Sequence, residues 1–128
     1  MKVLSTKAHG VLDYLVGALM IAAPWIFNFA NGGAETWVFV ALGIATLIYS
    51  LVTNYEFGAA KILSMRTHLV IDTLAGLFLA ASPWIFQFAN EVFWPHLIIG
   101  IIELCVVIIT DPIPYRTLNG AKTPMQHA

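Results

Sequence analysis

The sequence predicts an all-α membrane protein, a single domain with a bundle of four transmembrane helices built from two parallel two-helix repeats. Three observations lead to this prediction. The composition is too apolar for a small soluble domain, four apolar segments have membrane-spanning length, and nearly the whole chain is an internal duplication. The duplication also repeats a polar pair inside the apolar segments and a proline–tryptophan pair near their ends.

The composition favours a lipid environment. Of the 128 residues, 59% are hydrophobic and only 10% are charged, whereas soluble domains carry about 25% charged residues. A soluble chain this short leaves much of its surface in water, so it could not hide this much apolar surface. The net charge of −1 gives no basis for nucleic-acid binding.

Four apolar segments are the expected membrane spans, and they cover roughly 8–30, 34–53, 67–89 and 92–110. At 1.5 Å per residue, about 20 helical residues cross the roughly 30 Å hydrocarbon layer. Every lysine and arginine lies before the first segment, between the second and third, or after the fourth. The positive-inside rule therefore predicts a protein of the plasma or inner membrane with both termini cytoplasmic, including a tail over 112–128.

The internal repeat is clearest between residues 2–31 and 61–90, where 16 of the 30 aligned positions are identical. The alignment continues at an offset of 57 residues after a loop, so repeat 1 covers 2–54 and repeat 2 covers 61–111. Each repeat holds two helices, so both repeats cross the membrane in the same direction, the parallel case of a duplicated membrane protein.

A proline–tryptophan motif recurs near the end of the first and third segments, as Ala23-Pro24-Trp25 and Ser82-Pro83-Trp84. Serine is a good helix N-cap, proline is favoured at the first helical position, and proline disfavours helical geometry at the residue before it. The motif therefore predicts a break or kink at Pro24 and at Pro83. It also places Trp25 and Trp84 at the membrane interface, where tryptophan is enriched.

The duplicated motif resembles that of the SPW-repeat membrane proteins, over about residues 2–111 of this chain. The resemblance implies the fold and the membrane location, and it implies no particular activity. The first copy departs from the pattern because Ala23 stands where the second copy has Ser82.

A polar pair with helical spacing recurs in the same two segments, as His9 with Asp13 and His68 with Asp72. Residues four apart share a helix face, and each pair is followed four residues later by a glycine on that face. Ionisable groups inside a membrane normally face the bundle interior, and glycine permits close helix contact. We therefore expect the first and third helices to meet and the four side chains to converge in the cytoplasmic half.

A single carboxyl group breaks this symmetry. Glu103 lies in the fourth apolar segment, and its repeat counterpart is Thr46. A carboxyl group at this depth must be protonated, paired or hydrated. The expected partners are His9, His68 or a water-filled cleft between the repeats.

The polar cluster admits four interpretations. The side chains could fix helix packing by bonding to one another, or form a proton or ion pathway. They could also bind zinc or another divalent ion, or His9 and His68 could ligate a haem. The sequence predicts no cofactor outright and leaves the metal and the haem open.

The chain lacks a glycine-rich phosphate loop, a nucleophile elbow and the HExxH and CxxC motifs, which favours a protein without catalytic activity. Two function classes remain: a binding or transport module, and a structural or interaction protein. The expected partners are the lipid bilayer and either a second copy, through small residues such as Gly43, Ala45 or Gly100, or another membrane protein. His96 has no histidine counterpart and is expected at the membrane interface.

Overall fold

A computed structural model describes residues 2–115; residues 116–128, which hold most of the predicted tail, lie outside the described part, as does residue 1. Four helices follow one another: α1 (Thr6–Ile26), α2 (Ala34–Leu51), α3 (Met65–Ile85) and α4 (Trp94–Ile109). The predicted all-α bundle of four helices is confirmed.

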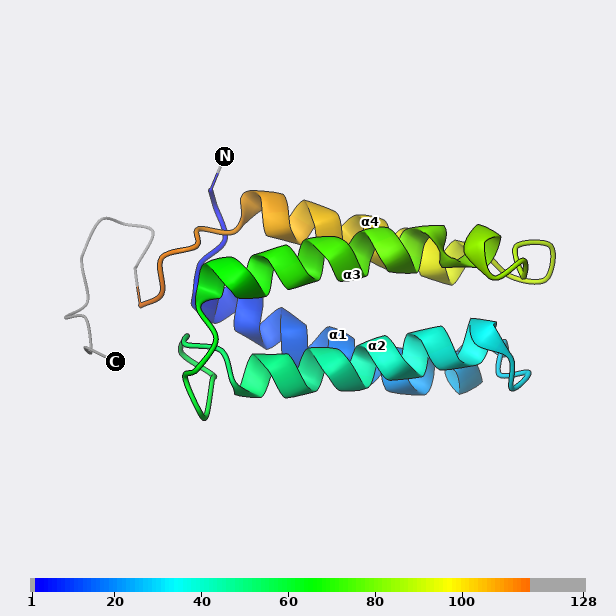
Figure 1. Ribbon diagram of the computed structural model, residues 1–128, viewed down its shortest axis with the longest axis horizontal. Helices are drawn as coiled ribbons and strands as arrows, with labels where there is room; N and C mark the ends of the chain where they lie inside the picture. The colour runs from blue at the N-terminus through cyan, green and yellow to red at the C-terminus, as the bar shows by residue number, and fades with distance from the viewer. Residues whose placement is uncertain (1, 116–128) are drawn as a thin grey trace.

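The bundle consists of two helical hairpins (Figure 1). α1 packs along α2, and α3 packs along α4, whereas contacts between the hairpins are fewer and are made mainly by α2 and α3. The two short loops lie at one end of the bundle, here called the loop end. The N-terminal segment, the central loop between α2 and α3, and the end of α4 lie at the other, here called the terminal end. α1 and α3 therefore run in the same direction, as the parallel repeat predicts.

The helix surfaces suit lipid. α1, α2 and α3 are long and apolar enough to cross a membrane, and α4 is a shorter apolar helix of 16 residues. Large aliphatic side chains point outward along these helices; Leu15, Leu74 and Ile108 are each more than 60% exposed. Apolar area of this kind is unfavourable in water and favourable in hydrocarbon. The chain is a membrane protein.

The repeated Lys-x-Leu-Ser segments close the two hairpins on each other at the terminal end. In each copy the serine caps the helix that follows, with the hydroxyl of Ser5 or Ser64 accepting a backbone N–H at 3.2 Å. The leucine before each serine forms an isolated bridge to a threonine, Leu4 to Thr110 and Leu63 to Thr53. The segment before α1 thus pairs with the end of α4, and the segment before α3 pairs with the end of α2.

The glycines of the repeat pack within the hairpins, contrary to the expectation that they bring the first and third helices together. A Cβ atom added at Gly43 would lie 2.8 Å from the carbonyl oxygen of Gly17, and one at Gly100 would lie 2.6 Å from that of Gly76. Gly43 and Gly100 are therefore buried in contacts inside the chain. They are not free to form the contact between copies that the sequence suggested.

The sequence predicted a break or a kink at the proline motif, and the structure contradicts the break. α1 continues through Pro24 to Ile26, and α3 continues through Pro83 to Ile85. Ser82 does not cap a new helix; its hydroxyl donates to the carbonyl of Leu79 at 2.7 Å. That carbonyl lies four residues before Pro83, and proline has no amide hydrogen to offer it. The serine hydroxyl therefore replaces the hydrogen bond that the proline removes.

The helices end just after the motif in a left-handed turn. Asn28 and Gln87, equivalent in the repeat, have φ angles of 59° and 62°. The amide of the next residue, Phe29 or Phe88, returns to the carbonyl of Pro24 or Pro83 at 2.8 or 2.9 Å. This is the Schellman arrangement of a helix C-terminus. The predicted corner is present, and its bend lies after the proline.

His96 is buried, not interfacial as the sequence suggested. Its ring is fully enclosed and packs against Phe29, Phe39 and Phe88, with ring centroids 4.5–5.4 Å away. Its Nε2 donates to the Glu35 carbonyl at 2.9 Å. The side chain therefore joins α4 to the start of α2 at the loop end.

We predict that Ser82→Ala lowers the free energy of unfolding by about 1–3 kcal/mol, because it leaves a buried carbonyl without a partner. The reciprocal change Ala23→Ser supplies the missing hydroxyl in the first repeat and should stabilise the protein by about 1 kcal/mol. Denaturant unfolding in detergent micelles measures both. An unchanged stability for Ser82→Ala would show that another group serves the Leu79 carbonyl.

Candidate functional site

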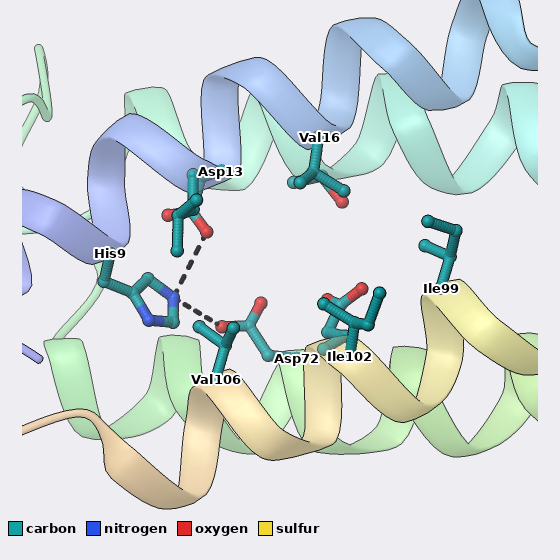
Figure 2. A pocket seen from close by; sticks show the side chains of 10 residues that line it. His9, Asp13, Val16, Asp72, Ile99, Ile102 and Val106 are labelled. Carbon is teal, nitrogen blue, oxygen red and sulfur yellow. Dashed lines mark hydrogen bonds and ion pairs between the residues drawn. The ribbon is translucent and has the colours of Figure 1, made fainter.

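Two histidines and two aspartates form a closed ring between the hairpins. The ring runs from His9 Nε2 to Asp13 (3.1 Å), to His68 Nε2 (3.2 Å), to Asp72 (3.2 Å) and back to His9 (3.0 Å). Nitrogen and oxygen atoms alternate around it. All four residues are buried, with at most 8% of any of them exposed. Figure 2 shows His9, Asp13 and Asp72 pointing toward one another from α1 and α3.

Two threonines fix the tautomer of both histidines. The Thr53 hydroxyl donates to the Tyr49 carbonyl at 2.6 Å, and the Thr110 hydroxyl donates to the Val106 carbonyl at 2.6 Å. Each hydroxyl has one hydrogen, so it can only accept from the imidazole beside it. His68 Nδ1 therefore donates to Thr53 at 2.7 Å.

By the same reasoning His9 Nδ1 donates to Thr110 at 2.9 Å. Both Nδ1 atoms consequently carry a hydrogen, and both Nε2 atoms face the ring.

Two tyrosines hold the carboxylates. The hydroxyl of Tyr49, from α2, donates to Asp72 at 2.5 Å, and that of Tyr55, from the central loop, donates to Asp13 at 2.8 Å. Burial and the neighbouring Asp13 charge raise the pKa of Tyr55 above its ordinary value of 10, so the phenol stays protonated and remains a donor. Each of the four ring residues thus has one hydroxyl partner outside the ring.

One ring nitrogen has no hydrogen bond. His68 Nε2 is buried and lies 3.2 Å from both carboxylates, yet it makes no hydrogen bond of acceptable geometry with either. Its in-plane direction is therefore aligned with neither oxygen. An N–H group aimed between two carboxylates makes a weaker, shared interaction with each of them, and a nitrogen lone pair in the same place could share a cation with their oxygens.

Glu103 lies beside the ring and not in it. It lines a cavity of about 60 Å³ together with His9, Asp13 and Asp72. Within residues 2–115 no hydrogen bond or ion pair joins Glu103 to His9 or His68, which the sequence suggested as partners. The cavity is lined by residues of both repeats, and the prediction that water fills the space beside Glu103 stays a prediction.

The sequence singled out the four ring residues because their types and spacing recur in both repeats. It missed Thr53 and Thr110 as partners of the histidines, although the repeat aligns these two threonines with each other. It also missed Tyr49 and Tyr55. Here the repeat gave no signal, because Tyr49 aligns with Val106 and Tyr55 lies outside the repeat. The motif residues Trp25 and Trp84 lie at the loop end, away from the ring, and are 59% and 53% exposed.

The fold and the ring together define a class: a membrane bundle of two parallel two-helix repeats that share one buried polar site. Residues 7–110 match the family model described as SPW repeat domain, and the chain belongs to this family. No curated protein and no solved structure matches the chain.

We predict that Asp72→Asn lowers the free energy of unfolding by about 3–5 kcal/mol, because it removes one partner from a buried ion-pair network. Glu103→Gln is the matched control: it neutralises a nearby carboxyl group that has no ion pair and should change stability by less than about 1 kcal/mol. Unfolding in mixed detergent micelles measures both variants. Equal effects of the two changes would show that the ring does not hold the hairpins together.

Proposed function

We propose that the protein is a membrane-embedded binding module that holds one divalent transition-metal ion in the His/Asp ring. The observation that carries the proposal is the buried Nε2 of His68, which faces two carboxylates and hydrogen-bonds to neither. The donor atoms of His9, Asp13, His68 and Asp72 all lie within 4.8 Å of one another. Such a group of imidazole and carboxylate donors is the ligand type of zinc and related ions.

The spacing of the ring supports a four-coordinate ion. Zinc–ligand bonds of about 2.0–2.1 Å place the ligand atoms of a tetrahedral site about 3.3 Å apart. The four nitrogen–oxygen distances around the ring are 3.0–3.2 Å, and Asp13 contacts the two histidines with different oxygens. With one donor atom from each residue, the four atoms lie within 4.8 Å of one another. Small adjustments of side chains would therefore complete the site.

The outer partners of the ring also suit a metal. Ligating histidines normally donate their second N–H to an acceptor, and ligating carboxylates are themselves hydrogen-bonded, which fixes their orientation. Here Thr110 and Thr53 accept from the two histidines, and Tyr49 and Tyr55 donate to the two aspartates.

Charge balance specifies what the ion displaces. With Nδ1 protonated, each Nε2 carries either a proton, which makes an imidazolium, or a lone pair that binds the metal. Two imidazolium groups with two carboxylates are neutral, and two neutral imidazoles with two carboxylates and one divalent cation are also neutral. Binding one cation therefore exchanges it for two protons and leaves no net charge on the four ring residues.

The same geometry argues against haem. The rings of His9 and His68 are 5.4 Å apart between centroids and meet edge to face. A porphyrin would have to pass between them, through the space in which Asp13 and Asp72 contact both histidines.

The location in the cell is part of the proposal. The positive residues of the described chain gather at the terminal end, for which the positive-inside rule gives a cytoplasmic position in the plasma or inner membrane. His9 and His68 lie in the first turns of their helices, near that end. The site is then in the cytoplasmic half of the bilayer.

We predict that the purified protein binds about one Co²⁺ or Zn²⁺ per chain and that His9→Ala with His68→Ala abolishes binding. Thr53→Val and Thr110→Val should each weaken binding by about 10–100-fold, because they remove the group that orients a ligand. Thr73→Val is the matched control, since the Thr73 hydroxyl also donates to the carbonyl four residues earlier, that of Leu69, and to no histidine. Metal analysis and Co²⁺ absorption titration measure the stoichiometry and the affinity.

Proton release gives an independent measurement. Binding should release about two protons per ion at a pH where both histidines are protonated in the metal-free protein, and the affinity should fall as the pH falls. A pH-stat titration in weakly buffered detergent solution counts the protons. A protein that binds no metal, while Asp13→Asn with Asp72→Asn still lowers its stability, would show that the ring serves helix packing alone.

A further inference from the structure

The cavity beside the ring lies between α1 and α4 (Figure 2). Its wall contains three of the four ring residues, His9, Asp13 and Asp72, together with Glu103 and mainly aliphatic side chains. Its volume of about 60 Å³ accommodates several water molecules, since each needs about 10–15 Å³ by this measure. The ring therefore borders a space large enough for water and for a partly hydrated cation.

The internal duplication accounts for a difference between the two sides of the ring. The α2–α3 contact is equivalent to the α4–α1 contact, and it is filled by Tyr49, which reaches Asp72. The residue of α4 equivalent to Tyr49 is Val106, which is too short to reach Asp13 in the same way. Likewise Glu103 replaces Thr46. The second repeat thus has an opening and a carboxyl group where the first has a tyrosine and a threonine.

The central loop and the segment before α1 cover the ring at the terminal end. At the terminal end, Tyr55 is fully buried above Asp13 and packs against Gly10, where an added Cβ atom would lie 2.8 Å from its ring. The central loop is held in place by further hydrogen bonds, including one from the Tyr14 hydroxyl to the Phe57 carbonyl. Beside it, the segment before α1 pairs with Thr110.

We propose that the cavity between α1 and α4 is the path by which the cation reaches the ring, and that Glu103 is its transient carboxylate ligand on that path. This inference rests on the metal binding proposed above. A carboxylate is a ligand for the same ions that the ring holds. At this position it offers the cation one protein oxygen in place of a water molecule before the ring supplies the rest. Glu103 is thus a residue of the exchange path and not of the final site.

The decisive experiment replaces Val106 of the second repeat with tyrosine, the residue at the equivalent position of the first repeat. Val106→Tyr should fill the cavity and slow the loading of Co²⁺ into purified protein by at least about 10-fold, with the final stoichiometry unchanged. Ile108→Tyr is the matched control, because it adds the same side chain to α4 at a position that is 63% exposed on the lipid-facing side. Glu103→Gln should also slow loading, and Glu103→Asp should restore most of the rate. Stopped-flow absorption of bound Co²⁺ measures these rates.

The outcomes separate this inference from the function on which it rests. Wild-type protein that binds no Co²⁺ overturns both. Wild-type protein that binds Co²⁺, with Val106→Tyr loading at the same rate, overturns the path and leaves the binding site standing.

A second measurement covers the case in which Val106→Tyr does not fold. In a Cys105→Ser background, Glu103→Cys should react with a water-soluble cationic thiol reagent at least about 10-fold faster than Ile101→Cys, which faces lipid. Equal reaction rates would overturn the path.

Discussion

The structure depends on one requirement: four ionisable side chains buried between two helical hairpins must neutralise one another. A single charged group in the bilayer interior is expensive, and the alternating ring of His9, Asp13, His68 and Asp72 removes that cost by pairing every charge twice. The threonine and tyrosine hydroxyls, the bridge segments and the central loop are arranged around this ring. Each of them supplies a hydrogen bond or excludes water, and each would have no reason for its position without the ring.

The duplication gives the molecule an approximate twofold axis, and the chemistry of interest lies where that symmetry fails. The histidine, aspartate and threonine positions obey it. The tyrosines do not, because both are supplied by repeat 1 and the central loop, and α4 has Val106 and Glu103 where α2 has Tyr49 and Thr46. A fully symmetric ring would be equally closed on both sides. The asymmetry gives one side a solid wall and the other a cavity with a carboxyl group.

The sequence predicted the features that arise from local pattern and repetition. The length of the apolar segments predicted the helices. The four-residue spacing of His9 and Asp13 predicted that their side chains share one helix face. Features that depend on which side chain meets which backbone group were not predictable. The role of Ser82 depends on the carbonyl that Pro83 leaves free, and the serine–proline pair alone suggested a cap. The glycines were expected to bring α1 and α3 together, but they pack against the other helix of their own hairpin. Glycine permits close helix contact in either place, so the sequence could not distinguish the two.

The sparse packing between the hairpins has a consequence for how the molecule responds to its surroundings. Each hairpin is held internally by close glycine contacts along its length. The two hairpins are joined by the polar ring, by the contact of α2 with α3, by the paired segments at the terminal end and by His96 at the loop end. The ring is the one of these crosslinks that depends on ionisable side chains. A change in the charge of any of its four side chains would therefore change how stiffly the halves of the protein are coupled.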